Sequence, residues 1–121
     1  MPAQQPMFDK YGGFAAVRTI VYDLYQRIRQ DDEINGYFEN VDFSRIVNHQ
    51  TKFVSSVMGG PASYTDEQLR KLHQHLPITG GDFDRLMAIL GDALAESGVE
   101  ADDAALILAR MQDRRDLVVN A

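Results

Sequence analysis

The chain has 121 residues and no cysteine, which excludes disulfide bonds, thiolate metal sites and cysteine nucleophiles. Its 18 acidic residues outnumber the 12 lysines and arginines, the net charge is −6 and no basic cluster occurs, so sequence-independent binding to nucleic acid is disfavoured. Hydrophobic residues make up 45% of the composition, enough for the core of one domain, and no apolar run is long enough to span a membrane.

Residues 1–7 contain neither a basic cluster nor an apolar stretch, so we expect a flexible N-terminal tail rather than a signal peptide. No internal repeat or linker follows, and we therefore expect residues 8–121 to form a single domain. The lack of cysteine fits a cytoplasmic protein, which is the location we expect.

The spacing of the apolar residues predicts an all-α fold. They recur every three or four positions, and no segment shows the sustained two-residue alternation of a strand. The first stripe contains Val17, Val21, Leu24, Tyr25 and Ile28. In chain order we predict a helix over 13–30, a short turn near 32–37, and helices over 42–58, 65–76, 82–97 and 101–117.

Three ends of these helices carry recognisable signals. Asp42 precedes an apolar stripe and can cap the helix that follows by accepting a hydrogen bond from its first turn. Thr65 and Gln68 have the spacing of a reciprocal capping box. Gly98 stands where a residue with a left-handed backbone conformation is expected to end a helix.

Candidate chemistry centres on three histidines, because no HExxH motif, phosphate-binding loop or dinucleotide-binding glycine pattern is present. His73 and His75 are two residues apart and would point to different sides of a helix, and we place His75 at the surface. His73 belongs to an apolar stripe with Leu69, Leu72 and Leu76.

Two interpretations of His73 are open at this point. It is either a half-buried histidine bonded to a backbone carbonyl, or a metal ligand whose second ring nitrogen is fixed by the carbonyl one turn back, that of Leu69. His49 lies on the apolar side of another predicted helix and poses the same alternatives. Two histidines from two helices can approach one metal from opposite sides, as in a haem site.

Six short segments stand out by their order and spacing: 8–13 (FDKYGG), Tyr25, 37–38 (YF), 49–53 (HQTKF), 59–60 (GG) and 72–73 (LH). Together they resemble the group I truncated haemoglobins over nearly the whole chain. The resemblance implies a two-over-two helical sandwich around one b-type haem. It also implies that the helix over 13–30 pairs with that over 42–58, and the helix over 82–97 with that over 101–117.

The resemblance assigns roles to individual residues. His73 would be the proximal iron ligand, Tyr25 the distal tyrosine and Phe38 the phenylalanine that wedges the haem. Tyr25 has an alternative role as a core tyrosine whose hydroxyl finds a backbone acceptor. The distal polar cluster falls on Ile46, His49 and Gln50.

Further contacts with the haem are expected around these residues. Arg45, Lys52 and the hydroxyl of Tyr64 can reach the two propionates, or they are solvated surface residues. His49 matches a histidine that is a sixth iron ligand in cyanobacterial relatives, so it would coordinate the iron when no gas is bound. Apolar contacts would come from Phe38, Phe53, Leu69, Leu72 and Met87.

Three departures from the family pattern have consequences. Ile46 stands where a glutamine is frequent and offers no hydrogen bond, so the other distal residues have to supply it. Asp113 stands where some cyanobacterial members have a histidine bonded to a haem vinyl group, so we expect the haem to be held non-covalently. The segment 77–81 is shorter than is usual after the proximal helix.

The implied function is binding of O2, and also NO and CO, at the haem iron. It would serve NO dioxygenation, peroxide chemistry or gas sensing, with electrons from a separate reductase because the sequence has no flavin or nicotinamide motif. We expect a monomer or a weak homodimer. Two other classes stay open: a haem-free helical interaction module with structural histidines, and a bare transition-metal site at His49 and His73.

Overall fold

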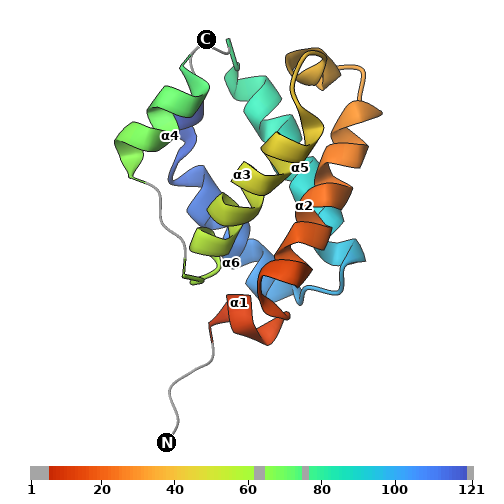
Figure 1. Ribbon diagram of the computed structural model, residues 1–121, viewed down its shortest axis with the longest axis vertical. Coiled ribbons are helices and arrows are strands. Elements are labelled where there is room, and N and C mark those ends of the chain that lie inside the picture. The colour runs from red at the N-terminus through yellow and green to blue at the C-terminus, as the bar shows by residue number, and fades with distance from the viewer. Residues whose placement is uncertain (1–5, 62–64, 75–76, 120–121) are drawn as a thin grey trace, which may run out of the picture.

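The computed structural model describes residues 6–61, 65–74 and 77–119, leaving aside the side chain of Leu72. In these ranges the chain forms only helices, which confirms the predicted all-α fold (Figure 1). The helices are α1 (Met7–Lys10), α2 (Gly13–Arg29), the 3₁₀ helix η1 (Asn35–Phe38), α3 (Phe43–Val57), α4 (Asp66–His73), α5 (Gly80–Glu96), α6 (Ala101–Gln112) and α7 (Arg115–Val118).

Two helix pairs organise the structure, as the resemblance implied. The most extensive packing is that of α2 on α3, and α5 packs on α6 while also contacting α2. These four helices form the two-over-two sandwich. By contrast, α4 lies at the edge of the view in Figure 1, and within the described residues α7 is the element against which it packs most.

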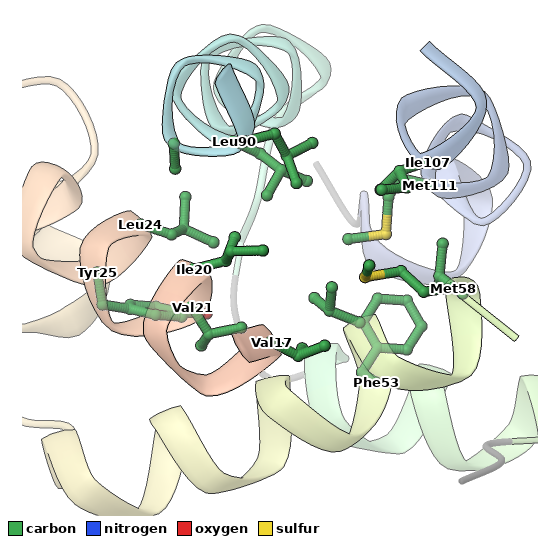
Figure 2. Close-up of a cluster of buried hydrophobic side chains, with 14 of the residues drawn as sticks. Val17, Ile20, Val21, Leu24, Tyr25, Phe53, Met58, Leu90, Ile107 and Met111 are labelled. Atoms are coloured by element: carbon green, nitrogen blue, oxygen red, sulfur yellow. The ribbon is translucent and has the colours of Figure 1, made fainter. Parts of the chain in front are cut away.

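The core lies between these two pairs. Figure 2 shows the side chains of Val17, Ile20, Val21 and Leu24 from α2 turned toward Leu90 of α5 and toward a second group from α3, its C-terminal end and α6. That second group contains Phe53, Met58, Ile107 and Met111, all of them buried. This burial explains the apolar stripes at three- and four-residue spacing in the sequence.

The predicted capping signals are confirmed. The Asp42 side chain accepts a hydrogen bond from the Arg45 amide at 3.2 Å. Thr65 and Gln68 form the reciprocal capping box, with bonds of 2.9 and 3.1 Å. Gly98 has a φ of +83° just after α5. Side-chain oxygens thus satisfy amides that have no partner within the first turns of α3 and α4.

Two predicted helix boundaries were wrong. The helix over 82–97 begins two residues earlier, at Gly80, because the Thr79 side chain accepts from the Asp82 amide at 3.1 Å and so caps the helix from an earlier position. The helix over 65–76 ends at His73, and Gln74 follows as its C-cap. His75 and Leu76 lie outside the described residues.

The helix predicted over 101–117 is divided into α6 and α7. The Arg114 amide donates to Met111 O at 3.0 Å, which tightens the turn. The Arg114 guanidinium donates to Arg110 O at 2.6 Å. In a continuous α-helix that carbonyl would accept from the Arg114 amide. The division allows α7 to change direction and pack against α4.

The N-terminal end of the described chain packs closely on the end of α3. The expected flexible tail, residues 1–7, falls mostly outside the described residues, and Met7 begins α1. The Phe8 amide donates to Met58 O at 3.0 Å. A Cβ at Gly60 would lie 2.6 Å from the Phe8 ring, so this close approach requires glycine. No helix in the described ranges is long and apolar enough to cross a membrane.

Candidate functional site

A cavity of about 400 Å³ opens between α2, α3, α4 and α5, a volume typical of small-molecule sites. Its lining is mainly apolar, with a few polar groups. The lining residues are Leu24, Tyr25, Phe38, Val41, Asp42, Arg45, Ile46, His49, Gln50, Phe53, His73, Ile78, Phe83, Leu86, Met87, Leu90, Met111, Arg114 and Val118.

Most of the site residues expected from the sequence meet at this cavity. Leu69 is not among its lining residues, although it is buried, with 2% of its surface exposed. Lys52 is exposed on α3 and also does not line the cavity. The side chain of Leu72 and the whole of Tyr64 lie outside the described residues. Those that do line it are Tyr25, Phe38, Arg45, Ile46, His49, Gln50, Phe53, His73 and Met87.

His73 is the last residue of α4, and its imidazole lines the cavity. Its Nδ1 lies 2.8 Å from Leu69 O, which confirms the hydrogen bond predicted one turn back. A carbonyl oxygen only accepts, so Nδ1 carries the hydrogen and donates it. In the neutral ring the lone pair is then on Nε2, the state in which this nitrogen can bind a metal.

Tyr25 comes from α2 and is buried, with its ring edge-to-face against Phe38 at a centroid distance of 5.5 Å. Burial raises the pKa of its hydroxyl, which keeps the group a protonated donor. Among the residues that the structure describes, this hydroxyl has no hydrogen-bond partner. The alternative role, a core tyrosine bonded to a backbone acceptor, finds no such acceptor there.

One face of α3 supplies four lining residues. Ile46, His49, Gln50 and Phe53 follow each other at spacings of three, one and three, which places them on one side of a helix. His49 and Gln50 are half-buried, and Phe53 is buried. We call the cavity-lining residues of α2 and α3 the α2–α3 wall.

A smaller wall comes from α4, the segment after it, and α7. We call His73, Ile78 and Val118 the α4–α7 wall. Ile78 and Val118 are buried together with Phe83 in a separate apolar cluster, against which Tyr37 packs. The hydroxyl of Tyr37 donates to Asp82, and Pro77 O is 3.0 Å away.

Sequence reasoning missed about half of the lining. The lining residues of α5 form an apolar stripe that is visible in the sequence, but the stripe alone does not predict that they face this cavity. Arg114 gave no signal, because its place on the cavity follows from the division between α6 and α7. The missed residues are Leu24, Val41, Asp42, Ile78, Phe83, Leu86, Leu90, Met111, Arg114 and Val118.

The donor set fits a haem better than a bare metal ion. Among the described residues no three histidine or carboxylate side chains converge on a point where they could hold an ion. A porphyrin supplies four nitrogens itself, so the protein has to add only an axial ligand and an apolar surround. One imidazole with its lone pair on Nε2, beside a mainly apolar cavity, meets that requirement.

Comparisons with known proteins agree with this geometry. The sequence profile of the bacterial-like globin family matches residues 6–120. A group 1 truncated haemoglobin of Synechocystis is 30% identical over 119 residues, covering 93% of this chain and 96% of that protein. One from Nostoc is 29% identical over 114 residues, covering 94% and 97%.

Solved structures share the fold. The 2/2 haemoglobin of Synechococcus, in the cyanomet state and with covalently attached haem, has a TM-score of 0.88 at 27% identity and covers 97% of this chain and 100% of its own. The Fe(III) truncated haemoglobin of Tetrahymena pyriformis has a TM-score of 0.87 at 23% identity, with the same coverage. From the family match, these relatives and the fold, the chain belongs to the bacterial-like globins and is a group 1 truncated haemoglobin, a haem-binding globin.

Proposed function

We propose that this protein holds one haem b non-covalently in the cavity and binds O2, and also NO and CO, at its iron. The observation that carries the proposal is His73, whose Nδ1 donates to Leu69 O at 2.8 Å at the edge of a mainly apolar cavity. When bound, the haem would supply an iron at which a diatomic gas can coordinate.

The α4–α7 wall would supply the axial ligand. Nε2 of His73 carries the lone pair that binds iron, and the Leu69 carbonyl fixes the ring orientation and increases the basicity of the imidazole. Phe38 and Met87 would contact the flat faces of the porphyrin, as would Phe53. Leu69 does not line the cavity and would act from behind the imidazole. Leu72 keeps its expected role as an apolar contact.

The α2–α3 wall would stabilise the gas. O2 takes on partial negative charge when it binds ferrous iron, so a hydroxyl or amide donor stabilises it. Tyr25 and Gln50 can donate, whereas Ile46 offers no hydrogen bond. His49 would occupy the iron when no gas is present, and a gas would then have to displace it.

The polar edge of the cavity would hold the propionates. Arg45 is exposed and lines the cavity, so it can meet a carboxylate there while remaining in water. Lys52 is exposed on the same helix but away from the lining, which leaves Arg45 as the better candidate of the two. Tyr64 keeps its expected role as a further propionate contact.

Non-covalent attachment is supported by the residues near the end of the chain. Asp113, the C-cap of α6, is exposed and cannot bond to a haem vinyl group as a histidine can. The proposal includes NO dioxygenation, peroxide chemistry or gas sensing as uses of the site. It also includes a separate reductase, a cytoplasmic location and a monomeric or weakly dimeric state.

Haemin titration tests the proposal. The unmodified protein should take up one equivalent and show an intense Soret band, and acidified butanone should extract all of the haem. His73→Ala should lose stable uptake, while His75→Ala should keep it. A protein that takes up no haemin would favour the haem-free interaction module instead, and haem that resists extraction would overturn non-covalent attachment.

The same spectra report on His49. Low-spin bands in the resting protein that become high-spin in His49→Ala would support internal ligation by this residue. High-spin bands in the unmodified protein would rule it out.

A further inference from the structure

The helix that carries His73 is short, and among its described side chains Leu69 is the one that belongs to the main core. It is eight residues long, and within the described residues it packs chiefly on the four-residue helix α7. The α2–α3 wall, in contrast, stands on helices of 17 and 15 residues in the main core. The position of α4 therefore depends strongly on what holds its two ends.

The N-terminal end of α4 is held by its capping box. Beyond its C-terminal end, the next described residue is Pro77, and the Tyr37 hydroxyl lies 3.0 Å from the Pro77 carbonyl oxygen. The same hydroxyl donates to the Asp82 carboxylate in the first turn of α5. The two acceptors share the single hydrogen of the hydroxyl, and through it Tyr37 connects η1 to two segments that lie 40 and 45 residues further along the chain.

The Tyr37 ring adds apolar contact to this shared hydrogen bond. It packs against the cluster of Ile78, Phe83 and Val118, in which Ile78 is 3% exposed. The hydrogen bond to Asp82 raises the pKa of Tyr37, with desolvation second, so the hydroxyl remains a protonated donor. Ile78 directly follows Pro77 and lines the cavity.

We propose that Tyr37 is a positioning residue for His73: its hydroxyl and ring hold Pro77 and Ile78, which follow α4 in the sequence, against η1 and α5, and this restraint fixes the depth and orientation of the proximal imidazole. The inference rests on the proposed function for its consequence at the haem. The tether itself involves only residues of this chain, so it can be tested without haem.

Tyr37→Phe is the sharpest variant, because it removes one oxygen and keeps the ring that packs on the apolar cluster. Tyr11→Phe is the matched control. The Tyr11 hydroxyl also donates to an aspartate, Asp103, and accepts from the Glu100 amide at 3.0 Å, but it joins α1 to α6 and does not line the cavity. Both variants lose a tyrosine–aspartate hydrogen bond of the same kind.

Without haem, Tyr37→Phe should speed hydrogen exchange of the α4 amides about tenfold, the loss expected for one hydrogen bond, while Tyr11→Phe leaves α4 unchanged. With haem, Tyr37→Phe should speed transfer of haem to excess apomyoglobin by about the same factor. It should also shift or broaden the iron–histidine stretching band in resonance Raman spectra of the ferrous protein.

Equal exchange of α4 in the two phenylalanine variants would overturn the tether. Faster exchange with an unchanged iron–histidine band would overturn its action on His73. A third outcome separates the two proposals. If the unmodified protein takes up no haem but Tyr37→Phe still speeds exchange of the α4 amides, the proposed function and the action on His73 are wrong. The contact between Tyr37 and the residues after α4 is then still supported.

Discussion

The two walls of the cavity are built in different ways. The α2–α3 wall is one face of long helices whose other contacts make the main core, so its residues are positioned by burial. The α4–α7 wall consists of two short helices and a connecting segment. Its helices add Leu69 and Leu117 to the main core, Ile78 and Val118 lie in the smaller cluster, and hydrogen bonds hold the ends of α4. Because the short helices have fewer residues in the main core, we expect the α4–α7 wall to open more readily than the α2–α3 wall.

This difference matters for the proposed chemistry. The donors that would face a gas lie on the firmly held wall, where a hydrogen bond keeps its geometry. The proposed iron ligand lies on the wall of short helices, where we expect modest changes in sequence to alter how tightly haem is retained. Variants in the two walls should therefore affect different measured quantities: the free energy of global unfolding, the rate of gas release, or the rate of local opening.

The largest effect is expected in the core. Leu94 of α5 is fully buried and does not line the cavity, so Leu94→Ala should lower the free energy of unfolding by about 2–5 kcal/mol. Leu69→Ala removes an equally buried side chain from α4. In urea denaturation of the haem-free protein it should lower the free energy of unfolding clearly less, because α4 contributes less to the part of the protein that unfolds cooperatively. Equal decreases in the free energy of unfolding would mean that both walls unfold together with the core.

The next effect concerns the donors of the α2–α3 wall. Tyr25→Phe should speed O2 release roughly tenfold to a hundredfold, since a hydrogen bond to a charged acceptor contributes about 1.5–3 kcal/mol. Tyr22→Phe, on the exposed side of the same helix, is the control and should leave release unchanged. Stopped-flow measurement with CO should show a smaller change, because bound CO carries little charge. The same acceleration for both gases would show that Tyr25 acts by its size.

The smallest effect comes from the two helix caps. Asp42→Ala and Thr65→Ala each remove a side-chain acceptor from a first turn, a loss of about 0.5–2 kcal/mol. For α3 the loss should appear as a lower midpoint of urea denaturation. For α4 it should appear mainly as faster hydrogen exchange of the α4 amides, with the midpoint nearly unchanged. A matching drop in midpoint for both variants would contradict the separation of the walls.

The sequence predicts the α2–α3 wall well because helical periodicity is local information. Ile46, His49, Gln50 and Phe53 share a face by spacing alone, and the structure places all four on the cavity. The caps at Asp42 and Thr65 are equally local and were confirmed. The same holds for the bond between His73 and the carbonyl one turn back.

The rest of the site depends on contacts between distant parts of the chain. No local pattern shows that the Tyr37 hydroxyl reaches Pro77 and Asp82, since these bonds join residues 40 and 45 positions apart. The division of the last helix was missed because the Arg114 side chain competes with its own backbone for Arg110 O, a contact that the spacing of apolar residues does not show. Arg114 and Val118 therefore reach the cavity without a signal in the sequence.

The packing of α4 on α7 has a consequence for synthesis on the ribosome. Helices α2 and α3 leave the exit tunnel early and in succession, and each is the other's main packing partner. Helix α4 emerges soon afterwards, yet its chief partner α7 is translated only after α5 and α6. The nascent chain therefore exposes the His73 side of the cavity until α7 has emerged, and a haem captured before that moment would lack one wall of its site.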